Sequence, residues 1–218
     1  MSPLRLALAG LGGYLAGTFP SADLAARLAG GGVSLRSAGS TNQGAANAAQ
    51  VLGPSWGAAV LAADVAKGAG AAALGRRLAG PSGAHLGAVA AVVGHCYPVW
   101  SGWRGGKGVA ASAGQCLATF PAYFPIDLGV AYATARWRQR AWEATACSSA
   151  CWVAAGLWWW RKGWPNAWGP PAGPDLPLAA AATSAVILLR FAQGGGRGTR
   201  GWATVTGASG GPGPGDRR

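Results

Sequence analysis

The segment 83-GAHLGAVAAVVGHCYPVW-100 is an almost unbroken run of apolar and small residues. It approaches the roughly 20 residues that an α-helix needs to cross a bilayer. A similar block, 4-LRLALAGLGGYLAGTFPSADLAARLAG-30, lies near the start of the sequence. Of the 218 residues, 50% are hydrophobic and only 11% are charged. Because a soluble domain carries roughly 25% charged residues, the sequence predicts an all-α, polytopic transmembrane helix bundle.

Apolar runs predict helices at about 4–29, 52–75, 83–101, 108–135, 141–160 and 176–193. The run 108–135 contains Pro121, Pro125 and Asp127, so it predicts a broken or re-entrant helical hairpin rather than one span. The expected total is about five full spans within a bundle of about six or seven helices. The runs are rich in Ala and Gly, which favours close approach of helix backbones.

The chain divides into a membrane domain at 1–193 and a Gly/Pro/Arg-rich tail at 194–218, which we expect to be disordered. The first apolar block resembles a signal peptide in its charge at Arg5. It lacks a convincing cleavage site before further apolar blocks follow, so we interpret it as a mature helix.

The net charge of +12 is spread over short loops and the tail instead of forming one stripe, which favours contact with anionic lipid over nucleic acid. An external N-terminus places 12 Lys or Arg residues on the cytoplasmic side and five outside. The four cysteines show no CxxC or Cys/His metal spacing, so we expect buried thiols and no metal site; they are Cys96, Cys116, Cys147 and Cys151.

Two glycine-punctuated polar stretches interrupt the apolar blocks. The first, 36-RSAGSTNQGAANAAQ-50, supplies hydroxyls, amides and backbone N–H groups that can bind an oxyanion before a helix. The second, 103-WRGGKGVAASAGQ-115, combines paired glycines, the cation Lys107 and a helix start, which are the components of a phosphate site. It does not have the Walker A spacing. An ordinary polar connector and a positive-inside loop are the alternative interpretations.

Ionisable residues also occur inside the apolar runs. Asp64 and Lys67, in 64-DVAKG-68, lie one helical turn apart and can neutralise each other. They are either functional or a structural ion pair. His95, in 94-GHCYP-98, is a candidate base or ligand, but a lone His near a helix end is more often a hydrogen-bonding strut.

The remaining composition excludes several chemistries. With only six acidic residues and two histidines, no Ser-His-Asp order, carboxylate cluster or metal-ligand set emerges. What remains is chemistry that depends on positioning and charge stabilisation around phosphate at a membrane face. A small transporter is a third possibility, to which only the hairpin at 108–135 points.

Taken together, these motifs resemble the bacterial acyl-phosphate glycerol-3-phosphate acyltransferases, the PlsY family. The stretch 36-RSAGSTNQGAANAAQVLG-53 is similar to the family pattern R-x-x-G-S-G-N-x-G-A-T-N-x-x-R-x-x-G. The stretch 94-GHCYPVWSGWRGGKGVAASAG-114 is similar to G-H-x-x-P-v-f-x-x-F-K-G-G-K-G-V-A-T-x-x-G, and 64-DVAKG-68 lies between them in the family order. The resemblance covers about residues 10–115.

The resemblance implies transfer of a fatty acyl group from acyl phosphate to the 1-position of glycerol 3-phosphate, giving lysophosphatidate and phosphate without a metal or other cofactor. It implies a multi-pass protein of the bacterial plasma membrane with its active site facing the cytoplasm. A monomer is compatible with it, and the oligomeric state stays open. By motif position the catalytic residues would be Ser40, Asn42 and Lys107. The substrate-binding residues would be Arg36, Gly39, Thr41, Gly44, Asn47, Asp64, Lys67, His95, Arg104, Gly105, Gly106, Gly108 and Arg140.

The chain departs from the family pattern at several points. Thr41 and Ala46 replace Gly and Thr of the first motif, and Gln50 stands where relatives have an Arg. The third motif, H-R-x-N-I-x-R-L-x-x-G-x-E after the last helix, is missing, because the chain reads 186-VILLRFAQGGGRGTRG-201. These departures leave a degenerate, non-catalytic member with an anion-binding pocket as the alternative.

Overall fold

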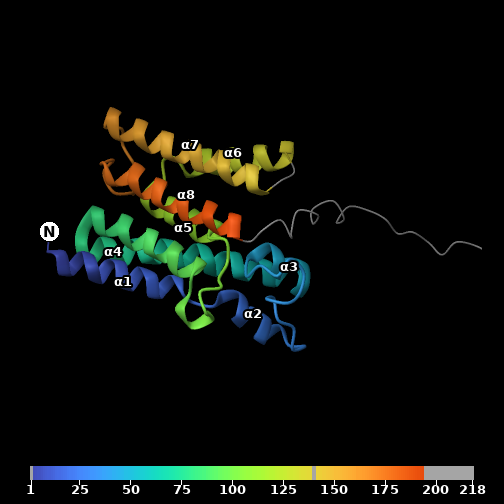
Figure 1. Cartoon of the computed structure of the whole chain (residues 1–218). Helices are drawn as coiled ribbons and strands as arrows, with labels where there is room; N and C mark the ends of the chain where they lie inside the picture. Colours follow the sequence, from blue (N-terminus) through green and yellow to red (C-terminus); the bar gives the residue numbers. More distant parts are fainter. Residues whose placement is uncertain (1, 139–140, 194–218) are drawn as a thin grey trace, which may run out of the picture.

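The fold is all-α, as predicted, in a computed structural model that describes residues 2–138 and 141–193. Figure 1 shows the long helices lying side by side as a bundle, with the short α2 and α3 gathered at one end. The described ranges contain no strand. The helices are α1 (Pro3–Gly17), α2 (Ser21–Ala29), α3 (Ala45–Leu52), α4 (Pro54–Cys96), α5 (Val109–Thr119), α6 (Phe124–Arg138), α7 (Ala141–Lys162) and α8 (Asp175–Gln193), with a 3-10 turn η1 at Val99–Ser101.

The first apolar run does not form the single helix expected over 4–29. It breaks between α1 and α2, because Pro20 has no backbone N–H and disfavours helical geometry at Phe19. The Thr18 hydroxyl donates to the carbonyl of Leu15 at 2.7 Å and closes the last turn of α1. The break therefore leaves α2 as a separate short helix at the end of the bundle where α3 also lies (Figure 1).

α4 is a helical hairpin rather than one long span. Its backbone leaves helical geometry at Ala79 (φ −143°, ψ 32°) and Gly80 (φ 61°, ψ −152°), where glycine accommodates the positive φ. The two halves return against each other so closely that a Cβ on Gly75 would overlap the carbonyl oxygen of Gly83. These halves correspond to the runs predicted at 52–75 and 83–101.

The run predicted as a broken hairpin at 108–135 is two short helices. α5 ends at Thr119, the backbone turns at the following residue Phe120 (φ −142°, ψ 55°), and α6 begins at Phe124. Pro121 occupies the turn between them, where its missing N–H costs no helical hydrogen bond. The sequence prediction of this break is confirmed.

Small residues bring α1 against the second half of α4. A Cβ on Gly13 would overlap the carbonyl oxygen of Gly87, and one on Gly17 would overlap that of Ala91. The two contacts advance by the same number of residues on both segments, so α1 and this half of α4 run parallel. The prediction of close packing from Ala and Gly is confirmed here.

Within residues 2–138 and 141–193, two segments are long and apolar enough to cross a membrane: Pro54–Ser101, which contains the α4 hairpin, and Asp175–Gln193. Apolar side chains also face outward on α1, where Leu4, Leu8, Leu11 and Leu15 are 66%, 44%, 56% and 46% exposed. Such a stripe fits contact with lipid. The count of about five full spans stays a prediction.

The cysteines lie in different environments. Cys96 and Cys116 are buried free thiols, as expected. The expectation of burial is wrong for Cys147, which is exposed on α7, and Cys151 is only partly buried. The reason is that both lie in an apolar helix whose outer face is not covered by another helix.

The loops divide between the two ends of the bundle. At one end, Arg36 Nη1 donates to the Arg104 carbonyl at 2.8 Å, which joins the loop before α3 to the loop before α5. At the other end, Arg76 Nη1 donates to the Trp168 carbonyl at 2.9 Å, which joins the turn of α4 to the loop before α8. Every predicted site residue that lies in a described loop is at the end of the bundle where Arg36 meets Arg104.

Candidate functional site

The loop before α3 is supported by one buried amide. Asn47 is 1% exposed, and its Nδ2 donates to the carbonyls of Leu35 and Ala38, both at 3.1 Å. Its Oδ1 accepts from the backbone N–H of Ser40 at 2.8 Å. The structure therefore places Asn47 beneath the loop, where it sets the backbone course of the predicted catalytic segment.

The tip of this loop is exposed at the surface of the protein. Gly39 and Thr41 have φ of 60° and 57°, and Ser40 between them is exposed. Among the described residues, the Ser40 hydroxyl has no hydrogen-bond partner. Asn42 and Gly44 lie partly buried just before α3, whose N-terminal cap is Gly44. The loop thus presents a free hydroxyl and free amides at a helix start, which suit an oxyanion.

Arg36 connects three segments of the site. Besides the Arg104 carbonyl, its Nη2 reaches Asp23 Oδ2 of α2 at 2.8 Å and the Ser101 hydroxyl at 3.0 Å. Two of the predicted residues, Arg36 and Arg104, therefore meet here, together with Asp23 and Ser101, which the sequence analysis did not select. Through these three hydrogen bonds Arg36 aligns the two loops with the start of the chain segment that forms α2. The Arg104 side chain itself is exposed.

The glycine loop, residues 104–108, is pinned to the end of α4. The N–H of Gly105 donates to the Cys96 carbonyl at 3.0 Å, and that of Gly106 to the His95 carbonyl at 3.1 Å. A Cβ on Gly106 would overlap His95 Nε2 and approach the Gln43 carbonyl at 2.8 Å. Gly108 has φ 89° and caps α5. Glycine is needed at 105 and 106 because the carbonyl and the side chain of His95 occupy the space of a Cβ, and at 108 because of the positive φ.

Lys107 is the cation of this loop. It is partly buried, and its Nζ lies 4.3 Å from the centre of the Phe191 ring. Burial lowers the pKa of the Lys107 ammonium below its ordinary value. No acidic side chain in the described ranges pairs with it. An ammonium without a counter-charge, beside glycine backbone and a helix start, can bind a phosphate group.

Arg190 is a site residue that the sequence analysis did not select. From the last turn of α8 its guanidinium donates to the carbonyls of Gly105 at 2.9 Å and Gly106 at 3.3 Å. The available signal was a single cation at the end of the last apolar run. That signal does not distinguish a loop anchor from an ordinary positive-inside residue.

A buried ionic cluster lies behind the two loops. Asp64 is 1% exposed and accepts from the Ser21 hydroxyl at 2.5 Å and from Lys67 Nζ at 2.8 Å. His95 Nδ1 lies 3.6 Å from the same carboxylate oxygen, and Lys67 also donates to the Phe19 carbonyl at 3.2 Å. The predicted Asp64 and Lys67 pair is present, and it ties both halves of α4 to the start of α2.

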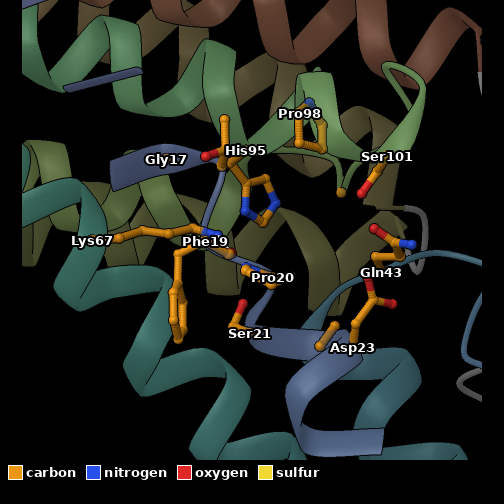
Figure 2. A pocket seen from close by; sticks show the side chains of 13 residues that line it. Gly17, Phe19, Pro20, Ser21, Asp23, Gln43, Lys67, His95, Pro98 and Ser101 are labelled. Atoms are coloured by element: carbon orange, nitrogen blue, oxygen red, sulfur yellow. Dashed lines mark hydrogen bonds between the residues drawn. The ribbon is translucent and has the colours of Figure 1, made fainter. Parts of the chain in front are cut away.

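A narrow pocket opens between this cluster and the glycine loop. Figure 2 shows the His95 ring between Lys67 on one side and Gln43 and Ser101 on the other. Gly106 lines the same pocket, and the Gln43 side-chain nitrogen is buried there without a partner in the described part of the chain. Ser40, Asn42 and Lys107 do not line this pocket, so they face a different part of the polar end.

Other predicted residues fall elsewhere. Gln50, which replaces a family Arg, is exposed on α3. Arg140 lies outside the described residues, as do the tail at 194–218 and the region of the third motif after Gln193.

Comparison with known proteins gives a consistent result. The family model for glycerol-3-phosphate acyltransferase matches residues 7–208. A glycerol-3-phosphate acyltransferase of Synechococcus sp. (strain JA-3-3Ab) is 44% identical over 53% of this chain and 56% of that relative. One of Jannaschia sp. (strain CCS1) is 42% identical over 72% of this chain and 73% of that relative. The first relatives are thus matched over little more than half their length.

A solved structure shares the fold. The crystal structure of PlsY (YgiH), an integral membrane glycerol 3-phosphate acyltransferase in its glycerol 3-phosphate form, matches with a TM-score of 0.72 and 27% identity. The match covers 86% of this chain and 88% of that chain. The fold is therefore that of an integral membrane protein, and because the family model matches most of the chain, the chain belongs to the glycerol-3-phosphate acyltransferase family.

Proposed function

We propose that this protein transfers a fatty acyl group from acyl phosphate to the 1-hydroxyl of glycerol 3-phosphate, releasing lysophosphatidate and inorganic phosphate. The observation that carries the proposal is the junction of the Ser40 loop with the glycine loop through Arg36, beside an ammonium of Lys107 that has no acidic partner in the described ranges. Solved relatives in a glycerol 3-phosphate form and in a lysophosphatidic acid form support the choice of acceptor and product.

The reaction suits a site with few acids and bases. The 1-hydroxyl oxygen of glycerol 3-phosphate forms a bond to the acyl carbonyl carbon, and the bond from that carbon to the phosphate oxygen breaks. The hydroxyl proton passes to the leaving phosphate, so no protein base is required. The protein must then hold two phosphates and one carbonyl in line, which is catalysis by positioning and charge stabilisation.

The roles follow from position. Lys107, with the backbone of Gly105, Gly106 and Gly108, binds phosphate, and the α5 N-terminus adds its positive dipole end. Ser40 and Asn42 orient or stabilise the reacting carbonyl from the opposite loop. The buried Asn47 and Asp64 act at a distance by holding the loops.

The membrane orientation rests on charge. At the end that carries the proposed site, cations lie at Arg27, Arg36, Arg104, Lys107 and Arg190. Because Lys and Arg accumulate on the cytoplasmic side of membrane proteins, we place this end in the cytoplasm of a bacterial cell and the protein in its plasma membrane.

The deciding experiment measures phosphate release by purified protein in lipid bilayers supplied with acyl phosphate and glycerol 3-phosphate. Wild-type protein is expected to release phosphate and form lysophosphatidate in equal amounts. Ser40→Ala and Lys107→Ala are each expected to lower kcat/KM about 100-fold or more, as for loss of one charge-stabilising donor. Ser55→Ala and Lys162→Ala, which are exposed and outside the site, serve as matched controls.

The outcome separates the two candidate functions. If the wild type releases no more phosphate than the Ser40→Ala and Lys107→Ala variants, the enzyme proposal fails. The protein would then be a non-catalytic member of the family, in agreement with its departures at Gln50 and in the third motif.

A further inference from the structure

We infer that the last turn of α8 is part of the phosphate site: Arg190 positions the backbone of the glycine loop, and Phe191 positions the ammonium of Lys107. This inference rests on the proposed function, because it assigns positioning residues to the same phosphate-binding loop. It is carried by contacts between α8 and the loop, two segments separated by more than 80 positions in the sequence.

Arg190 fixes the direction in which the loop carbonyls point. Its Nη2 and Nε hold the carbonyls of Gly105 and Gly106, while the N–H groups of the same glycines bond to the end of α4. The paired glycines are thus held from both sides. Since glycine has no side chain to restrict its backbone, the loop depends on these contacts for the geometry that a phosphate would meet.

The guanidinium of Arg190 also contacts an aromatic ring at the end of α4. It lies 5.5 Å from the centre of the Tyr97 ring, and the Tyr97 hydroxyl donates to Gln193 Oε1 at 2.9 Å. The turn of α8 is therefore closed onto the end of α4. No acidic side chain in residues 2–138 and 141–193 pairs with Arg190, so its charge remains available to favour an anion at the loop.

Phe191 contacts the ammonium of Lys107. Its ring packs against the buried cluster of Val92, Cys96, Ala111 and Ile187, and its face supports the Lys107 ammonium. A cation over an aromatic face is stabilised by the ring quadrupole. In the described structure Phe191 provides the contact that a carboxylate provides in an ordinary ion pair, and it does so without neutralising the positive charge.

These contacts predict how substitutions at Arg190 and Phe191 change the affinity for inorganic phosphate. Arg190→Met is expected to weaken binding of inorganic phosphate about tenfold, since it removes two charge-assisted hydrogen bonds to the loop. Arg190→Lys keeps the charge and recovers part of that loss. Phe191→Leu keeps an apolar side chain but loses the ring, and it is expected to weaken phosphate binding about fivefold. Phe191→Tyr keeps the ring and is expected to bind phosphate as the wild type does.

The test uses full-length protein in lipid bilayers, with phosphate affinity measured by calorimetry and KM and kcat for acyl phosphate measured in parallel. In a Lys107→Ala background, Phe191→Leu is expected to have no further effect, because the group it supports is gone. Arg161→Met, an exposed arginine at the opposite end of the bundle, and Phe124→Leu are the matched controls.

Three results would overturn the inference. The first is unchanged phosphate affinity and KM in Arg190→Met and Phe191→Leu when the wild type is active. The second is a loss of kcat in proportion to folded protein at constant KM, which assigns both residues to fold support alone. The third is a further loss of phosphate affinity when Phe191→Leu is added to the Lys107→Ala variant, as large as the loss that it causes in the wild type. Failure of wild-type turnover would instead overturn the proposed function itself, and this inference with it.

Discussion

At the scale of single residues, the polar side chains of the motifs divide into groups that face the outside and groups that support the backbone. Ser40 is exposed with no hydrogen-bond partner in the described part of the chain, whereas Asn47 is buried and makes three hydrogen bonds to the loop around it. Both were predicted from the same motif. Burial and hydrogen bonding, which only the structure shows, separate them.

Asn47 makes a direct prediction about stability. Asn47→Ala leaves the carbonyls of Leu35 and Ala38 and the N–H of Ser40 without partners, so we expect a loss of about 2 kcal/mol in the free energy of unfolding. Denaturant unfolding in detergent micelles measures it. Gln50→Ala, an exposed amide on the same helix, is the control and should change stability by less than about 0.5 kcal/mol. Equal stability of both variants would contradict the supporting role.

At the scale of elements, glycine determines how closely helices approach. α1 and the second half of α4 touch through backbone atoms at Gly13 and Gly17, and the two halves of α4 touch at Gly75 and Gly83. Other glycines of the same helices, such as Gly70, have no neighbouring atoms within 4 Å of an added Cβ. Composition predicts that small residues bring helices together, but it does not tell which glycines do so.

The contrast between Gly13 and Gly70 can be measured. Gly13→Ala forces α1 away from the Gly87 backbone, and we expect a loss of about 2 kcal/mol in the free energy of unfolding. Gly70→Ala meets nothing and is expected to be neutral or to stabilise the protein by up to about 1 kcal/mol through helix propensity. Thermal unfolding of both variants in the same detergent gives the comparison. A stable Gly13→Ala variant would show that the two helices do not pack through this glycine.

At the scale of the whole molecule, the glycine-rich polar loops lie together at one end of an apolar bundle. The loop before α3, the glycine loop and the end of α8 meet there, although they come from distant parts of the sequence. The opposite end carries Arg76 and Arg77 in the α4 turn and Arg161 and Lys162 at the end of α7. We expect the two ends to face different sides of the membrane, with the site end in the cytoplasm.

Labelling in bacterial cells tests the orientation. In a chain with Cys147→Ser and Cys151→Ser, single cysteines are introduced by Ser55→Cys at the site end and Lys162→Cys at the other end, both exposed positions. A membrane-impermeant maleimide is expected to label only Lys162→Cys in intact cells and both after permeabilisation, because we propose that the cation-rich end lies in the cytoplasm. The chain without an introduced cysteine is the background control. Labelling of Ser55→Cys in intact cells would reverse the orientation.

Much of the fold was predictable because its signals are local. Apolar runs predicted the helices from about residue 52 onward, and prolines predicted the break between α5 and α6. The first run was predicted wrongly as one helix, because apolar residues continue on both sides of Pro20, whose missing N–H breaks the helix there. The Asp64 and Lys67 pair was predictable from its one-turn spacing.

The sequence by itself determined the helical class, the apolar surface and the two glycine-rich polar loops, because periodicity, chain breaks and glycine all act over a few residues. Only the tertiary structure decided that Asn47 supports the first loop, that Arg36 joins it to the glycine loop, and that Arg190 and Phe191 reach that loop from α8. The physical reason is that these contacts join segments far apart in the chain. Their energies depend on burial and distance, which no local pattern contains.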